Sequence, residues 1–264
     1  METVTIIQAR TGSKRLPGKI LQEALGKPIL LLMLERVQRA KTAGRIVIAT
    51  TSEKEDEKIA GLCAELGVNC FKGNTFDLLD RHYRCAKEFN ADTVVKIPSD
   101  CPLIDPLIID KVISFYNDNM DKFDFVSNLH PPSYPDGNDV EVFSFGALAE
   151  SWSDAYKNYE REHTTPYIWD NPRRFRIGNV KWETGLDFSL SHRWTLDYYE
   201  DYLLIKNIFE ELYEKNPQFG MNEILKLNKE KPGMFAINRE HRGYYWYRNH
   251  INELKTLKQE LIKN

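Results

Sequence analysis

Residues 3–19, with the sequence TVTIIQARTGSKRLPGK, constrain this chain more than any other stretch. A β-branched, apolar run ends abruptly at a loop that holds two glycines, one proline and four cations. Glycines let the backbone approach a ligand closely, and amide groups together with fixed positive charges favour a polyphosphate. The cations are Arg10, Lys14, Arg15 and Lys19, which match the roughly four negative charges of a nucleoside triphosphate. A solvated basic turn after an edge strand is the alternative.

Strands and helices alternate along the first 130 residues. Short runs rich in valine and isoleucine are separated by helical segments, which predicts a parallel sheet with helices on both faces. Right-handed crossovers then place every strand-to-helix loop on one edge of the sheet, where ligands of such folds bind. The expected strands are 3–9, 45–50, 68–72, 93–98 and 123–127, and the expected helices are 28–41, 54–66, 76–90 and 106–118. The predicted fold class is therefore a three-layer α/β/α arrangement around a mostly parallel, Rossmann-like sheet.

The pattern changes near residue 129, where a proline-rich loop begins. From there to about residue 190 we expect an inserted arm or lid within a single domain that spans residues 1–264. The elements expected in and after this insertion are a strand at 140–145, helices near 146–157 and 160–169, a strand at 174–182, an amphipathic helix starting near Asp197, and a C-terminal helical tail at about 245–264.

Composition and missing motifs exclude several classes of protein. The net charge of −3 argues against a general nucleic-acid surface, so the basic loop is a local feature. No apolar run approaches the ~18 residues that cross a bilayer, and the chain opens without a signal peptide, so we expect a cytoplasmic protein with no membrane partner. The four cysteines include no C-x-x-C pair and are expected to be reduced thiols. Nucleophile-elbow, H-E-x-x-H, Walker A and G-x-G-x-x-G motifs are also missing.

Two carboxylates are candidate ligands of Mg²⁺. Asp100 follows the apolar strand 93–98, which places it at the same sheet edge as the basic loop. Magnesium prefers one or two carboxylates together with phosphate oxygens and water. Asp197, in the stretch RWTLD, follows a short apolar approach and could share a metal with Asp100. Each could instead cap a turn or a helix, as we expect for Asp105.

Two polar clusters suit a polyhydroxylated, anionic ligand. The loop YPDGNDVEV contributes Asp136 and Glu141, and the segment REHTTPY contributes Arg161 and His163. An arginine can bind a carboxylate through two parallel hydrogen bonds, and the carboxylates of Asp and Glu accept hydrogen bonds from hydroxyl groups. The alternatives are a simple turn at Asp136 and a surface ion pair at Arg161. Arg81 is either a cation on a helix surface or a contact to the nucleotide.

The opening stretch closely resembles the nucleotide loop of the sugar-acid cytidylyltransferases, a family that includes the CMP-Kdo and CMP-acylneuraminate synthetases. The similarity is greatest with the branch named for spore coat polysaccharide biosynthesis protein F. Further stretches resemble that branch in the same order along the chain: SDCPLID, YPDGNDVEVF, REHTTPYI and RWTLDYYED. Such an ordered set of motifs is specific to the family. The similarity runs from residue 3 to about residue 209, and nothing recognisable follows it.

The resemblance implies a nucleotide-diphospho-sugar transferase-like fold, CTP as co-substrate, Mg²⁺ as cofactor and a homodimer. It also implies that Asp100 and Asp197 bind the metal. The residues that it places around the triphosphate and part of the cytidine are Ala9, Arg10, Thr11, Gly12, Ser13, Arg15 and Lys19. We add Arg81, Pro98 and Ser99 as candidate nucleotide contacts. The chain departs from the branch at Lys96 and Ser99, where we expect an arginine and a small Thr- or Gly-like residue; this departure concerns the base contacts.

The expected reaction is attack by an acceptor oxygen on the α-phosphorus of CTP with release of pyrophosphate, in surface polysaccharide or glycan biosynthesis. Positioning and charge neutralisation would do the work, so no protein nucleophile is required. Lys19 and Arg10 would hold the phosphates, Arg15 would stabilise the departing pyrophosphate, and the two polar clusters would bind a sugar-acid or related anionic acceptor. A glycosyltransferase using a nucleotide sugar and a non-catalytic nucleotide-binding subunit are alternatives, although the chain lacks the D-x-D pair usual in the former.

Overall fold

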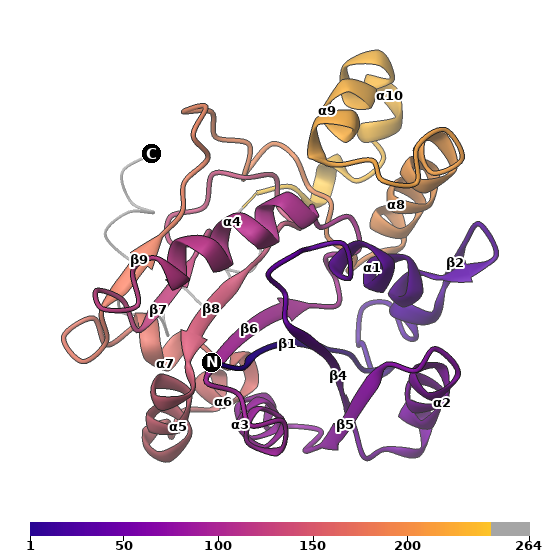
Figure 1. The fold of residues 1–264 in the computed structure, drawn as a ribbon. Coiled ribbons are helices and arrows are strands. Elements are labelled where there is room, and N and C mark those ends of the chain that lie inside the picture. Colours follow the sequence, from indigo (N-terminus) through magenta and orange to yellow (C-terminus); the bar gives the residue numbers. More distant parts are fainter. Residues whose placement is uncertain (244–264) are drawn as a thin grey trace.

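The computed structural model describes residues 1–243, and within them seven strands form one twisted sheet (Figure 1). The strand order across the sheet is β5-β4-β1-β6-β8-β7-β9. The strands are β1 (Thr3–Gln8), β4 (Arg45–Thr51), β5 (Asn69–Gly73), β6 (Thr93–Pro98), β7 (Phe125–Ser127), β8 (Glu141–Ser144) and β9 (Ile177–Asn179). This mostly parallel sheet confirms the predicted α/β class.

The strand directions bring distant loops to one edge of the sheet. Strand β1 pairs in parallel with β4 and β6, and β4 pairs in parallel with β5. Their carboxyl ends therefore lie together, as the sequence predicts. Strand β8 runs antiparallel to β6, with Lys96 opposite Glu141, so it is the amino end of β8 that reaches this edge.

Helices cover both faces of the sheet, and each face has its own hydrophobic core. One core includes residues of α1 (Ile29–Val37), α2 (Glu57–Glu65), α4 (Pro106–Asn117) and α8 (Tyr199–Leu212). The other includes residues of α3 (Leu78–Glu88), α5 (Phe145–Asp154), α6 (Asn158–His163) and α7 (Pro166–Trp169). The apolar faces of β1 divide between them, because Ile7 lies in the first core and Ile6 in the second. This is the predicted three-layer arrangement.

The structure differs from the predicted elements mainly after residue 129. The single helix expected over 160–169 is divided into α6 and α7, because Pro166 has no amide hydrogen for a continuing helix and instead occupies the first turn of α7. The strand expected over 174–182 is only β9, three residues long. The insertion also contributes β8 and β9 to the main sheet. Whether part of it serves as an arm or a lid stays a prediction.

Several short elements were not predicted. A two-stranded hairpin of β2 (Glu23–Ala24) and β3 (Lys27–Pro28) follows the basic loop, and the 3-10 helix η1 (Lys19–Leu21) precedes it. After α8 come α9 (Met221–Glu230), α10 (Pro232–Phe235) and the 3-10 helix η3 (Arg239–His241). In Figure 1, α9 and α10 lie beside α8. The predicted tail at about 245–264 lies outside the described residues.

Two composition-based expectations can be compared with the structure. All four cysteines are free thiols, as expected. None of the helices within residues 1–243 combines the length and apolar character that crossing a bilayer requires.

Candidate active site

The basic loop is folded back onto the carboxyl end of the sheet by one buried acid. Asp56 Oδ1 accepts hydrogen bonds from the amide and the hydroxyl of Thr11, at 2.7 and 2.6 Å. Its other oxygen accepts from the hydroxyl of Thr51 at the end of β4. The Gly18 amide donates to the Thr11 carbonyl at 2.9 Å, and Gly18 has a φ of 68°, which favours glycine. Asp56 was not among the predicted site residues, because an aspartate in an acidic stretch at the start of a helix is typical of a simple N-cap.

Lys19 links the basic loop to both predicted metal ligands. Its Nζ donates to Asp197 Oδ1 at 2.9 Å and to the Leu196 carbonyl at 2.7 Å, and it lies 3.5 Å from Asp100 Oδ2. Burial alone would lower the pKa of this lysine, but the two carboxylates raise the pKa above its usual value. Lys19 is therefore a fixed positive charge, with a side chain only 12% exposed.

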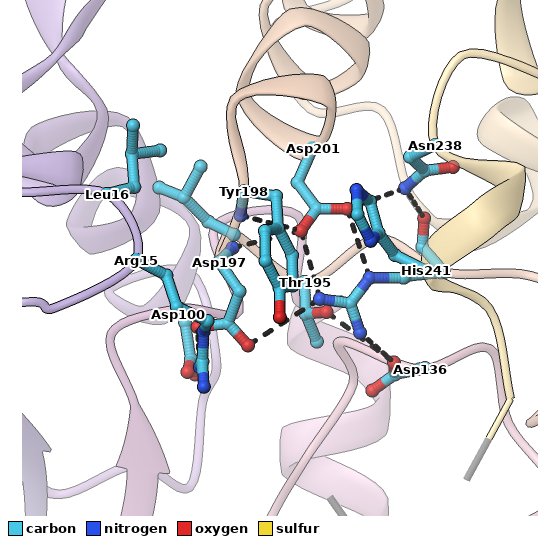
Figure 2. A network of polar contacts seen from close by, with 12 residues as sticks. Arg15, Leu16, Asp100, Asp136, Thr195, Asp197, Tyr198, Asp201, Asn238 and His241 are labelled. Carbon is cyan, nitrogen blue, oxygen red and sulfur yellow. Dashed lines mark hydrogen bonds and ion pairs between the residues drawn. The ribbon is translucent and has the colours of Figure 1, made fainter. Parts of the chain in front are cut away.

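Asp100 and Asp197 come from distant segments that are joined through the backbone. The Leu196 amide donates to the Asp100 carbonyl at 2.8 Å, so the segment before α8 runs beside the end of β6. Arg15 Nη2 lies 2.6 Å from Asp197 Oδ1. Burial acts to raise the pKa of Asp197, but the charges of Lys19 and Arg15 outweigh it and lower the pKa. The two carboxylates thus face a pair of loop cations, as Figure 2 shows for Arg15.

A buried arginine, Arg193, connects Asp197 of this pair to two further carboxylates. Its Nε and Nη2 donate to the two oxygens of Asp201 at 3.0 and 2.9 Å. Its Nη1 donates to Asp136 Oδ2 at 3.2 Å, and its Nη2 lies 3.5 Å from Asp197 Oδ2. Asp201 Oδ2 also accepts the amides of Asp197 and Tyr198, both at 3.0 Å. Arg193 and Asp201 both lie in the quoted stretch RWTLDYYED, but neither was among the predicted site residues; their spacing of four residues on each side of Asp197 was the available signal.

Residues 134–142, which we call the acidic loop, pack at Gly137 against the segment that carries Arg193 and Trp194. Asp136 forms a backbone bridge with Arg193, and Gly137 has a φ of 108°. A Cβ at Gly137 would lie 2.9 Å from the carbonyl carbon of Trp194, so only glycine fits. Partial burial, together with nearby Asp100 and other acids, raises the pKa of Asp136 to about 7 despite its contact with Arg193.

Asp139 lies in the same loop and was not among the predicted site residues. Burial and the neighbouring carboxylates of Asp136 and Asp100 raise its pKa well above the usual range. Four carboxylates therefore lie around the end of β6, from Asp100, Asp136, Asp139 and Asp197.

The other acceptor candidates lie outside this cluster. Glu141 forms a buried ion pair with Lys96 and accepts the Thr165 hydroxyl at 2.7 Å. Arg161 donates from Nη2 and Nε to Asp77 Oδ2, at 2.6 and 2.9 Å, on the face covered by α3. His163 ends α6. Their proposed contacts with an acceptor stay predictions.

Arg10 and Arg81 lie on the other side of the loop. Arg10 Nη1 donates to the Thr75 carbonyl at 3.3 Å. Arg81 is 3% exposed, and its Nε and Nη1 have no hydrogen-bond partner among residues 1–243. Burial, and then the charge of Arg10, lower the pKa of Arg81 to about 10. A buried guanidinium with unused donors is costly unless a ligand satisfies them.

The remaining nucleotide candidates surround the same edge. The Ala9 amide donates to the Ala49 carbonyl at 3.0 Å, and the Ser13 hydroxyl accepts the Leu16 amide at 3.3 Å. Gly12 has open space around its Cα. Pro98 ends β6 and the buried Ser99 follows it.

The donor set fits a magnesium ion that is completed by substrate. Asp100 and Asp197 supply two carboxylates, and Mg²⁺ takes few protein ligands besides phosphate oxygens and water. Within residues 1–243 no group of three or more His, Cys, Asp or Glu side chains has the geometry of a metal site. A metal here would therefore depend on the oxygens of a bound triphosphate.

Comparison with known proteins gives a consistent result. A family model described as cytidylyltransferase matches residues 4–261. The spore coat polysaccharide biosynthesis protein SpsF of Bacillus subtilis is 29% identical over 241 residues, covering 89% of this chain and 97% of the relative. A 3-deoxy-manno-octulosonate cytidylyltransferase of Trichlorobacter lovleyi is 36% identical over 115 residues, 43% of this chain and 44% of the relative. A solved cytidylyltransferase structure from Leptospira borgpetersenii is 33% identical, with a TM-score of 0.84 over 89% of this chain and 97% of that one.

Proposed function

The chain belongs to the cytidylyltransferase family and is a CTP-dependent nucleotidyltransferase, and from this premise we propose that it transfers CMP from CTP to an anionic sugar-like acceptor. The observation that carries the proposal is the position of Lys19, whose Nζ lies between Asp197 and Asp100 beneath the basic loop. Cations neutralise the charge of a bound polyphosphate, and carboxylates are the protein ligands of a metal ion that bridges the polyphosphate to the protein. The contacts of Lys19 place a cation of the loop beside the two carboxylates of Asp100 and Asp197.

The loop would bind the triphosphate through its amide groups and side chains. Lys19 and Arg10 would contact the phosphates, and Arg15 would neutralise the charge that develops on pyrophosphate as it leaves. Both Lys19 and Arg15 contact Asp197 in the structure, so the entry of a phosphate tail would replace one anion by another without leaving either cation unpaired.

The reaction proposed is a direct, in-line displacement. The acceptor hydroxyl gives its proton to solvent as its oxygen forms a bond to the α-phosphorus. The bond from that phosphorus to the bridging oxygen breaks, and pyrophosphate leaves with the electron pair. Asp100 and Asp197 would hold Mg²⁺. When bound, that ion polarises the α-phosphate and lowers the pKa of the acceptor hydroxyl.

The acceptor would lie beside the acidic loop. Asp136 belongs to the same cluster as Asp100 and Asp197, and its side chain is 30% exposed, so it can receive an acceptor hydroxyl. The SpsF relative serves spore coat polysaccharide biosynthesis, and another relative acts on 3-deoxy-manno-octulosonate. These names support a sugar acid, or a related anion destined for a surface polysaccharide, as the acceptor class.

The assembly and location of the enzyme belong to the same proposal. We propose a homodimer in the cytoplasm, with part of segment 129–190 serving as an arm toward the partner subunit or as a lid on its own site. The support is the family resemblance, which implies a homodimer. Light scattering coupled to size-exclusion chromatography, on the full chain and on a variant with a shortened 183–190 loop, separates the arm from the lid: an arm that holds the dimer together gives a monomer when shortened, and a lid does not.

One assay tests the activity. The enzyme is incubated with CTP, Mg²⁺ and a panel of sugar acids, phosphosugars and phosphonates, and pyrophosphate release is followed. We expect release with at least one anionic acceptor, and none with Asp100→Ala. The control is Asp118→Ala, which removes an exposed acid at the end of α4. Full turnover by a folded Asp100→Ala enzyme would remove this residue from the mechanism, and tight CTP binding without turnover on the whole panel would favour a binding subunit.

A further inference from the structure

The C-terminal segment reaches the candidate active site through one buried amide. Asn238, which lies between α10 and η3, is 1% exposed. Its Nδ2 donates to Asp201 Oδ1 at 2.8 Å and to the Arg193 carbonyl at 3.0 Å (Figure 2). Both amide hydrogens are therefore used on the network behind Asp197. The motifs that carry the family resemblance end near residue 209, so this contact comes from a part of the chain that they do not include.

The two acceptors of Asn238 are the groups on which the orientation of Asp197 depends. Asp201 holds the Asp197 amide through Oδ2 and holds the Arg193 guanidinium through both oxygens. The Arg193 guanidinium in turn lies 3.5 Å from the Asp197 carboxylate. A change in the position of Asp201 therefore moves Asp197 by two routes, through its backbone and through its side chain.

A neutral donor suits this position because the surroundings are already charged. Asp201 Oδ1 accepts hydrogen bonds from both Arg193 Nε and Asn238 Nδ2. Asp136 and Asp197 complete the group of acids around Arg193. A further carboxylate here would add repulsion in a buried site, whereas an apolar side chain would leave one lone pair of Asp201 without its donor.

We propose that Asn238 is a positioning residue for cytidylyl transfer: its two hydrogen bonds fix Asp201 and the Arg193 backbone, and through them the direction of the Asp197 carboxylate. The proposal rests on the proposed role of Asp197 in the reaction. It assigns the segment after α9 a part in the chemistry, in addition to its packing against α8. Because Asn238 acts through other residues, its loss should lower kcat more than it weakens CTP binding.

The test compares Asn238→Asp and Asn238→Leu with wild type in the full chain. The control is Asn216→Asp, the same change at an exposed position in the α8–α9 connection. At pH 8 we expect both Asn238 variants to lose at least tenfold in kcat, with KM for CTP within about threefold. Between pH 8 and pH 5.5, Asn238→Asp should recover relative to wild type, because burial beside Asp201 raises the pKa of the new carboxyl and its protonated form again donates a hydrogen bond. Asn238→Leu should not recover.

Each outcome bears on one claim. Full kcat at pH 8 in a folded Asn238→Leu enzyme would overturn the positioning role, and so would a loss in Asn238→Asp that does not depend on pH. Thermal unfolding identifies a variant that fails to fold, in which case the other variant decides. A wild-type enzyme that releases no pyrophosphate with any acceptor refutes the proposed function itself; an active wild type beside unaffected variants refutes only the role of Asn238.

Discussion

The Nζ of Lys19 donates a hydrogen bond to Asp197 Oδ1 at 2.9 Å and joins two residues that are 178 positions apart. The lysine comes from the loop after the first strand, and the aspartate precedes α8. Their contact closes the candidate active site, because it brings the proposed polyphosphate-binding loop against the proposed metal ligands.

Replacing Lys19 should disable the enzyme while leaving it folded. Lys19→Met removes a fixed cation from the phosphates, and loss of one such electrostatic contact costs about 10²–10³-fold in kcat. Asp197 keeps Arg15 and Arg193 nearby, so its charge stays compensated. Pyrophosphate release measures the effect, and Lys58→Met, on an exposed position of α2, is the control. Near-normal kcat/KM in Lys19→Met would contradict its phosphate role.

The unused donors of Arg81 predict a role in base selection. Cytosine offers two adjacent acceptors, O2 and N3, whereas uracil carries a hydrogen on N3 that would meet the guanidinium. A buried donor left unpaired by the wrong base discriminates strongly. We expect Arg81→Met to reduce the ratio of kcat/KM for CTP over UTP by at least about tenfold. The control is Arg84→Met, an exposed arginine on the same helix. An unchanged ratio would place Arg81 away from the base.

His82 should make the protein sensitive to acid. It is fully buried, and its Nδ1 donates to the Leu78 carbonyl at 2.9 Å. Burial, outweighing that hydrogen bond, lowers the pKa of His82 to about 3. Since the unfolded chain takes up a proton near pH 6.5 and the native state does not, stability falls as pH drops below 6.5, by up to about 1.4 kcal/mol per pH unit for this residue.

The change His82→Asn should therefore flatten the acid dependence. The asparagine amide can still donate to the Leu78 carbonyl but takes up no proton. Urea unfolding at pH 6.5 and pH 4.5 should show a loss of stability that is about 2 kcal/mol smaller in the variant than in wild type. Equal losses in the two proteins would show that His82 is not the group responsible.

Arg161 is expected to stabilise the fold. Its guanidinium is engaged by Asp77 at 2.6 Å and by the Trp152 carbonyl at 2.6 Å, in a part-buried position. We expect Arg161→Met to lower the free energy of unfolding by about 1–2 kcal/mol, because the partly buried Asp77 carboxylate and the Trp152 carbonyl would lose their charged donor. The predicted contact of Arg161 with an acceptor anion is measured separately, as the KM for the acceptor. A large rise in that KM without loss of stability would instead support the contact with an acceptor anion.

The mostly parallel sheet and the basic loop at its edge could be predicted from the sequence, because both depend on local patterns of apolar and charged residues. Alternating apolar strands and helices predict a mostly parallel sheet, and right-handed crossovers place its strand-to-helix loops at one edge. The order β5-β4-β1-β6 came from the structure alone. The same argument places Arg15, Lys19 and Asp100 at one edge, and there the structure has them. Beyond residue 129 the pattern is weaker, and the prediction missed the division of α6 from α7, as well as α9 and α10.

The sequence by itself determined which charges stand at the ends of which strands, since chain direction and hydrophobic period carry that information. Only the tertiary structure decided which of these charges meet. Asp136 joins Asp100 and Asp197 because Gly137 lets its loop lie against Trp194, whereas Arg161 turns to Asp77 on another face. Asn238 reaches Arg193 and Asp201 through the packing of α10 on α8, a contact between distant segments that leaves no periodic trace in the sequence.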